Sequence, residues 1–166
     1  MRTLSIGGVL AILVFALSAC GGSGGNSASE RALQREADEY QIDQIERTFH
    51  ESMSKKNVNM MMSLWAPHAT FPYGPGKTAT GKKEIRAFWK TSNSFLHKDR
   101  WISDHPAYKL RITVNGDRGT LHFECHFINL DTNEVAAYTA ADMDVARIDG
   151  HWLITKMVGG TTVPKI

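Results

Sequence analysis

The chain has 166 residues, of which 42% are hydrophobic, a share sufficient for one domain with a single packed core. Lys and Arg number 19 against 17 Asp and Glu, which gives a net charge of +2. No block of five or six like charges occurs. The composition therefore lacks the basic patch of a nucleic-acid-binding protein, and we expect no nucleic acid as a partner.

The N-terminus has the order of a secretory signal. Arg2 supplies a positive charge, residues 6–17 are apolar, and Leu-Ser-Ala leads into Cys20. The apolar run is shorter than the roughly 20 residues that span a bilayer. Leu-Ser-Ala-Cys also resembles the lipobox of bacterial lipoproteins, which implies that residues 1–19 are removed and Cys20 is lipidated. The alternative is ordinary secretion with Cys20 as a spare thiol.

Residues 20–30 are rich in Gly and Ser and are expected to form a flexible tether. Several acyl chains on one cysteine would make membrane anchoring stable. In the lipoproteins that the signal resembles, an aspartate after the cysteine favours the inner membrane, and Gly21 stands there. The resemblance implies a cell-envelope location. In a Gram-negative cell this is the outer membrane facing the periplasm, and in a Gram-positive cell the outer face of the plasma membrane.

Helical patterns follow the tether. A long amphipathic helix is predicted over 31–54 by one apolar stripe, Ile42, Ile45, Phe49 and Met53. Ser27 and Glu30 have the spacing of a capping box, so the helix is expected to begin near Ser29. A short second helix is expected from Asn57 to Pro67. A strand over 69–73, a Gly/Pro-rich loop over 74–81 and a third helix over 82–94 come next.

The C-terminal part alternates with period two. Leu121, Phe123, Cys125 and Phe127 predict one face of a buried strand. Turn sequences at 115–117, 131–133 and 149–150 predict an antiparallel meander. Helices followed by such a meander indicate an α+β fold with the helices on one sheet face.

Four segments carry a family resemblance: Leu-Trp-Ala at 64–66, His-Ala-Thr-Phe at 68–71, TGKKEIRAFW at 80–89 and DVARIDGHWLI at 144–154. Their order and spacing, over about 41–158, resemble the nuclear transport factor 2-like superfamily, nearest its SnoaL-like and ketosteroid-isomerase-like members. The resemblance implies a cone over residues 31–166, in which a curved antiparallel sheet packs against three N-terminal helices. An apolar pocket at the open end and a homodimer through the convex sheet face are also implied.

The steroid isomerases of this superfamily use a tyrosine and two aspartates. By spacing, these positions fall on Phe49, Tyr73 and Asp144. Phe49 has no hydroxyl, and a tyrosine is too weak a base near pH 7. We therefore do not expect enolisation of steroids by that mechanism.

Asp144 is the candidate catalytic residue. With Tyr138 and Asp142 it occupies one face of a predicted strand, which we expect to point into the cone. Asp144 would then be a carboxyl removed from water that exchanges a hydrogen bond with a ligand. The alternative is a structural hydrogen bond to a neighbouring strand or to an arginine such as Arg111 or Arg147. Asp142 is equally consistent with a surface position.

His122, Glu124 and His126 place three metal-ligand types on one strand face. Because the other face is apolar, these side chains are expected on the convex side, as a polar dimer surface. Cys125 is expected to be a small buried hydrophobe and not a nucleophile. We expect no metal and no cofactor.

These patterns favour a membrane-anchored domain that binds a small, largely apolar molecule. The alternatives are a lyase or isomerase that uses Asp144, and an envelope interaction domain that acts through the convex sheet face. The expected ligand-binding residues are Phe49, Tyr73, Phe88, Trp101, His105, Tyr138, Asp142 and Met157.

Overall fold

The structure is a computed structural model that describes residues 27–92, 101–103 and 107–162. Its elements are α1 (Ala28–Ser54), α2 (Val58–Ser63), β1 (Trp65–Gly74), β2 (Lys77–Thr80), α3 (Gly81–Ser92), β3 (Trp101–Ser103), β4 (Lys109–Asn115), β5 (Arg118–Asn129), β6 (Val135–Ile148) and β7 (His151–Thr162). The expected signal peptide over 1–19, Cys20 and His105 lie outside the described residues.

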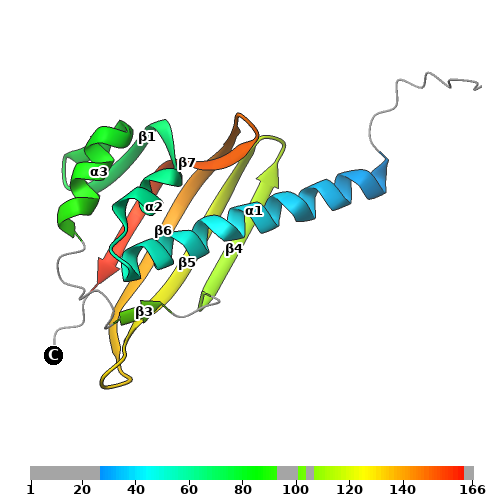
Figure 1. The fold of residues 1–166 in the computed structure, drawn as a ribbon. Helices are drawn as coiled ribbons and strands as arrows, with labels where there is room; N and C mark the ends of the chain where they lie inside the picture. The colour runs from blue at the N-terminus through cyan, green and yellow to red at the C-terminus, as the bar shows by residue number, and fades with distance from the viewer. Residues whose placement is uncertain (1–26, 93–100, 104–106, 163–166) are drawn as a thin grey trace, which may run out of the picture.

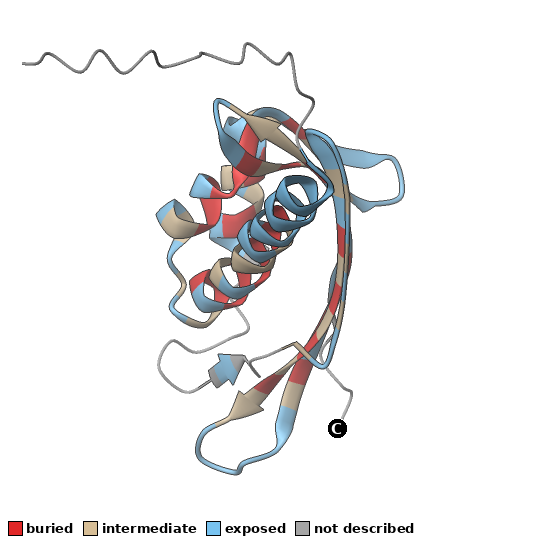
Figure 2. Cartoon of the chain, turned by 90° about the vertical axis from the view of Figure 1, so that its right-hand side faces the viewer, coloured by how far each residue is buried: buried red, intermediate tan, exposed pale blue. Residues whose placement is uncertain are grey.

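The seven described strands form one sheet in the order β2-β1-β7-β6-β5-β3, with β4 paired to β5 (Figure 1). The pairing of β1 with β7 is parallel, and the other described pairings are antiparallel. Seen edge-on, the sheet is curved and the helices pack on its concave side (Figure 2). The expected α+β class and curved sheet are therefore confirmed.

Helix α1 begins at the expected capping box. Ser27 Oγ accepts from the Glu30 N–H at 3.2 Å, and Glu30 Oε2 accepts from the Ser27 N–H at 2.6 Å. The stripe of Ile42, Ile45 and Phe49 is buried against the sheet. Residues 28–37 are exposed, and this end of α1 projects beyond the sheet in Figure 1. The flexible tether was expected over residues 20–30, but residues 28–30 of that range are helical.

The second helix is shorter than expected, because α2 ends at Ser63 and β1 begins at Trp65. The Leu64 carbonyl accepts from the Ile154 N–H at 2.8 Å, which starts the contact with β7. The regular pairing of β1 with β7 is interrupted between Trp65 and Thr70. Pro67 lies in this interruption, where a residue without an N–H is tolerated within a strand.

The loop expected over 74–81 contains a strand, because β2 returns along β1 with Phe71 opposite Ala79. Strand β3, which was not expected, pairs with β5 through Ile102 and Ile128. The three predicted turns are confirmed. Gly116 at the first and Asn133 at the second have φ of 59° and 58°, and Gly150 at the third has φ of 79°.

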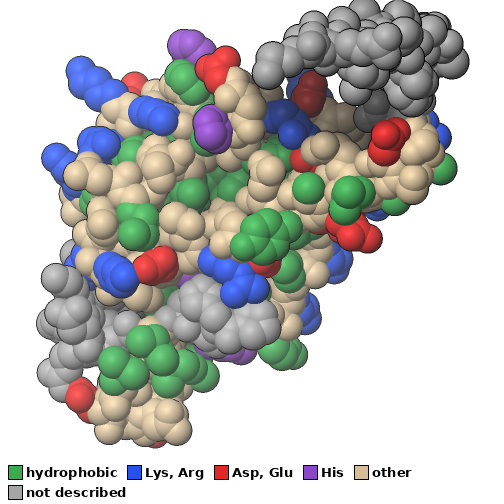
Figure 3. All heavy atoms as spheres, turned by 45° about the vertical axis from the view of Figure 1, so that its right-hand side comes forward, with side chains coloured by type: hydrophobic (Ala, Val, Ile, Leu, Met, Phe, Trp, Pro, Cys, Tyr) green, Lys and Arg blue, Asp and Glu red, His purple; other side chains and the backbone are tan. Residues whose placement is uncertain are grey.

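The core lies between the concave face of the sheet and the helices (Figure 2). Its largest fully buried side chains include Trp65, Phe49, Phe71, Phe123 and Phe127. On the exterior, Figure 3 shows apolar side chains among acidic and basic ones. No helix in the described part of the chain is long and apolar enough to cross a membrane.

Candidate functional site

Helix α1 carries Glu46 and His50, which are both ionisable, into the core. Glu46 and His50 are one turn apart, so they share the helix face that carries Ile42 and Phe49. Both are fully enclosed, with 1% and 0% exposure. A carboxyl buried in this way needs hydrogen-bonding or charged partners, because transfer from water without them is costly.

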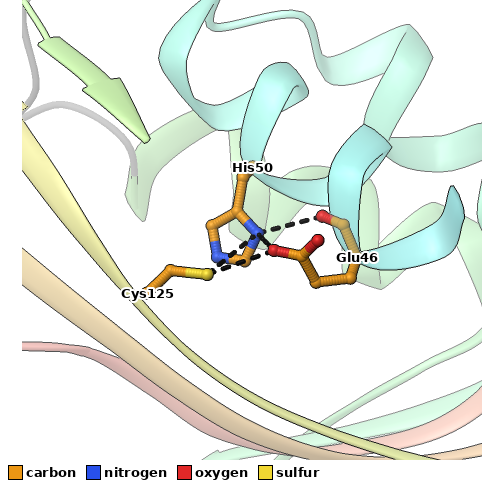
Figure 4. Close-up of side chains that lie close together, drawn as sticks. All are labelled: Glu46, His50 and Cys125. Carbon is orange, nitrogen blue, oxygen red and sulfur yellow. Dashed lines mark hydrogen bonds and ion pairs between the residues drawn. The ribbon is translucent and has the colours of Figure 1, made fainter. Parts of the chain in front are cut away.

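Strand β5 supplies the third member of this buried cluster. Cys125 shares the concave face of β5 with Phe123 and Phe127. Its side chain points at α1 (Figure 4). Its Sγ lies 3.1 Å from Glu46 Oε1 and 3.7 Å from His50 Nδ1. The His50 Nδ1 to Glu46 Oε1 distance is 2.9 Å. We call Glu46, His50 and Cys125 the buried polar cluster.

The hydrogen bonds of the cluster converge on Glu46. His50 Nδ1 lies 2.9 Å from the Glu46 backbone oxygen, and a carbonyl can only accept, so Nδ1 carries the hydrogen. The Cys125 thiol donates to Glu46 Oε1. The same imidazole nitrogen faces both the carboxylate and the sulfur. The cluster therefore lacks the two-sided imidazole that links an acid to a nucleophile in a catalytic triad.

Aromatic rings enclose this cluster. The His50 ring lies edge-on to Phe123, with ring centroids 4.6 Å apart, and to Phe49 at 5.3 Å. Phe49 in turn contacts Trp89 at 5.5 Å, and Trp89 stacks on Phe71 at 5.7 Å. The polar groups thus lie in an apolar interior with an aromatic wall.

The same wall reaches the surface at one end. Phe71 contacts Phe88 with ring centroids 4.8 Å apart, and Phe88 contacts Tyr73 at 4.9 Å. Tyr73 is 43% exposed. Trp89 is buried, and its Nε1 has no hydrogen-bond partner among the described residues. We call Phe49, Phe71, Tyr73, Phe88 and Trp89 the aromatic wall.

Three of the expected ligand-binding residues, Phe49, Tyr73 and Phe88, are brought together in this wall. Met157 on β7 is also buried in the core. Trp101 belongs to β3, but its side chain lies outside what the structure describes, as does His105.

The expectation that Tyr138, Asp142 and Asp144 face the pocket is wrong. Tyr138 is 46% exposed, and both aspartates are exposed on the outer face of the sheet. Register is the physical reason. Phe123 pairs with Ala141 and Leu121 with Met143, and directly paired residues share a face. The odd-numbered residues of β6 over 137–145 therefore point inward, and a shift of one residue reverses every side chain.

The three positions of the steroid isomerases are consequently not assembled. Phe49 is fully buried, whereas Asp144 lies on the opposite side of the sheet. Neither a hydroxyl on α1 nor a carboxylate from β6 faces the interior at these positions. The lyase or isomerase alternative that used Asp144 loses its catalytic residue.

The outer face of the sheet carries His122, Glu124 and His126, as expected. His122 Nδ1 lies 2.8 Å from Asp142 Oδ1 on the neighbouring strand. Lys109 donates to Glu124, and this hydrogen bond lowers the pKa of the Glu124 carboxyl. A depression of about 310 Å³ lies beside these side chains, and Asp144 and Lys156 are among its lining residues. It is separated from the aromatic wall by the sheet.

The buried polar cluster was not predicted from the sequence. The available signal was the presence of Glu46 and His50, four residues apart, on the apolar stripe of a predicted helix. Cys125 was correctly expected to face the core. Its proximity to α1, however, follows only from how the helix crosses the sheet.

The curved sheet and its covering helices place the protein in the nuclear transport factor 2-like fold. The chain belongs to the SnoaL-like family, whose domain model matches residues 34–158. No curated protein matches the chain.

Solved structures share the fold at low sequence identity. A protein of unknown function with a cystatin-like fold from Nostoc punctiforme is 18% identical, with a TM-score of 0.65 over 76% of this chain and 92% of that one. A putative dehydratase of the NTF2-like family from Streptomyces avermitilis is 13% identical, with a TM-score of 0.60 over 78% and 99%. A hexachlorocyclohexane dehydrochlorinase is 20% identical, with a TM-score of 0.57 over 81% and 93%.

Proposed function

We propose that this protein is a lipid-anchored, extracytoplasmic SnoaL-like domain that binds a small, largely apolar molecule along its aromatic wall. The observation that carries the proposal is a wall of aromatic side chains running from the exposed Tyr73 to the buried polar cluster. Ligand sites are typically apolar and aromatic with a few placed polar groups. The dehydratase and dehydrochlorinase among the structural neighbours share only the fold, which by itself does not define a reaction.

Trp89 provides a direct test of the proposed site. Its buried Nε1–H can donate to an oxygen of the ligand. We expect Trp89→Phe to weaken binding of 1-naphthol, a neutral probe with an acceptor oxygen. The expected loss is about threefold to tenfold, because one neutral hydrogen bond contributes about 0.5 to 1.5 kcal/mol. NMR titration of the probe gives the dissociation constants.

Trp152→Phe is the matched control, because the Trp152 Nε1 already donates to Asp38 at 3.3 Å. This variant should lose stability but keep its affinity for 1-naphthol. If the two variants bind equally well, Trp89 is not a ligand donor. If the wild-type protein does not bind the probe, the aromatic wall is ordinary core packing.

The proposed anchor rests on Cys20, the residue that follows Leu-Ser-Ala in the sequence. In cells supplied with a palmitate analogue, the wild-type protein should be labelled and should require detergent for extraction. Cys20→Ser should abolish the label, because the acylated sulfur is lost. Cys125→Ser is the control and should remain labelled. Equal labelling of wild type and Cys20→Ser would contradict lipidation at this residue.

A second candidate function is association of two copies through the outer sheet face. This face exposes Tyr108, Tyr138 and Val158, which are 63%, 46% and 46% accessible. Burial of such side chains favours association. Analytical ultracentrifugation of the full chain distinguishes one copy from two. A single species at all concentrations would leave the aromatic wall as the remaining proposed binding surface.

A further inference from the structure

We propose that the buried polar cluster binds one divalent zinc-type ion through Glu46 Oε1, His50 Nδ1 and Cys125 Sγ. This inference goes beyond the proposed function and does not depend on it. It also departs from the sequence expectation that the chain holds no metal. Among the described residues, the three donor atoms of the cluster lie within 4.8 Å of one another.

The donor set fits zinc in kind. Carboxylate, imidazole and thiolate are its ordinary protein ligands. Glu46 and His50 are four residues apart on one helix, the spacing that lets two helical side chains share an ion. Cys125 approaches from the facing strand, so the three ligands come from two elements that the core holds together (Figure 4).

The donor set also fits zinc in geometry. The three donor-to-donor distances are 2.9, 3.1 and 3.7 Å. Tetrahedral ligands at about 2.0 to 2.3 Å from one ion lie about 3.3 to 3.7 Å from each other. The two shorter distances would have to lengthen by a few tenths of an ångström, and His50 Nδ1 would have to give up its hydrogen bond to the Glu46 backbone oxygen. The three side chains supply three of the four positions of a tetrahedral zinc site.

Charge balance is compatible with an ion in this interior. For binding, the Cys125 thiol must lose its proton to the buffer, and His50 must present Nδ1 without a proton. The ion with one carboxylate and one thiolate then has no net charge. In the metal-free cluster, Glu46 Oε1 contacts both the Cys125 thiol and the His50 imidazole.

The enclosure of the buried polar cluster limits how a metal ion can reach it. Because the three side chains are at most 1% exposed, the ion is expected to enter while the chain folds. The full chain in detergent is therefore unfolded in urea and refolded with Zn²⁺ or Co²⁺. Metal retained after gel filtration is counted by mass spectrometry. With Co²⁺, the absorption spectrum should show tetrahedral bands and a thiolate-to-cobalt charge-transfer band.

We expect one ion per wild-type chain. Cys125→Ala should remove the charge-transfer band, and Glu46→Gln should weaken binding at least about a hundredfold, since even partners one shell further out cost 10- to 100-fold. Cys20→Ser controls for the other thiol and His122→Ala for the outer-face histidine, and both should bind as wild type does. Circular dichroism verifies that each variant is folded. If Cys125→Ala does not fold, Glu46→Gln decides the question.

Two results would overturn the proposal. One is a folded wild-type chain that retains no more metal than Glu46→Gln. The other is a cobalt spectrum without a thiolate band. Neither result bears on the binding of 1-naphthol by the aromatic wall, so failure of the metal site is distinguishable from failure of the proposed function.

Discussion

Replacement of Asp38 by Ala should lower the free energy of unfolding by about 2 to 4 kcal/mol, near the range for removing one partner of a buried ion pair. Asp38 is only 3% exposed, although it lies on α1. It accepts hydrogen bonds from Arg147 Nη2 at 2.6 Å and from Trp152 Nε1 at 3.3 Å. Its loss would leave both donors without this acceptor and remove these two contacts between α1 and the β6–β7 hairpin. Arg147 keeps Asp117 as a second partner, which limits the cost.

The effect of Asp38 should depend on pH. Burial raises the pKa of its carboxyl, but hydrogen bonds from Arg147, Trp152 and Gln34 lower it, and the net effect is a pKa below the ordinary value. A lowered folded-state pKa stabilises the fold above the unfolded value of about 3.9. This contribution is lost as the pH falls through the folded-state pKa. The difference between wild type and Asp38→Ala should therefore be largest near neutral pH and shrink in acid.

Urea unfolding at several pH values measures both effects, and Asp43→Ala is the matched control. Asp43 lies on the same helix and also pairs with an arginine, Arg47, at 2.7 Å. That pair is partly exposed, and exposed pairs contribute about 0 to 1 kcal/mol. Equal losses in the two variants would show that Asp38 does not tie α1 to the sheet.

Gly159→Ala should cost about 2 to 5 kcal/mol, from backbone strain together with a clash against the neighbouring strand. Gly159 has a φ of 142°, a conformation that residues with a side chain rarely adopt. A Cβ there would lie 2.6 Å from Ala141 Cα and would also collide with the Ala140 carbonyl on β6. Thermal unfolding followed by circular dichroism measures the loss.

Gly160→Ala is the control at the adjacent position, where nothing lies within 4 Å of an added Cβ. It should change stability by less than about 1 kcal/mol, as an unconstrained surface substitution does. If both variants melt together, the close approach of β6 and β7 at Gly159 does not constrain the sheet.

Local sequence predicted much of the fold. The stripe of Ile42, Ile45 and Phe49 predicted α1, and the Asn-Gly-Asp and Asp-Gly turns predicted two hairpins, because these signals act within a few residues. The sequence does not predict the start of β1, because a proline such as Pro67 is typical of a helix end. The irregular pairing with β7 that accommodates a proline is set by the tertiary structure.

The candidate site was less predictable. Buried and exposed residues alternate along β6. Because Ala137 and Ala141 on its inner face are small, they give a weaker apolar signal in the sequence than Tyr138 on its outer face does. Its orientation is decided by register with β5, where large inward rings such as Phe123 face small partners. The contact of Cys125 with Glu46 and His50 joins residues 75 or more positions apart. No local pattern contains that information.

Native mass spectrometry of the protein purified from its host cells under gentle conditions tests the proposed function most directly. We expect a chain with one small, largely apolar molecule bound noncovalently, which is lost on denaturation and extracts into organic solvent. The Trp89→Phe variant should retain less of it than Trp152→Phe does. A folded, cell-derived chain that carries no such molecule, and takes up neither 1-naphthol nor an extract of cellular lipids, would contradict this proposal.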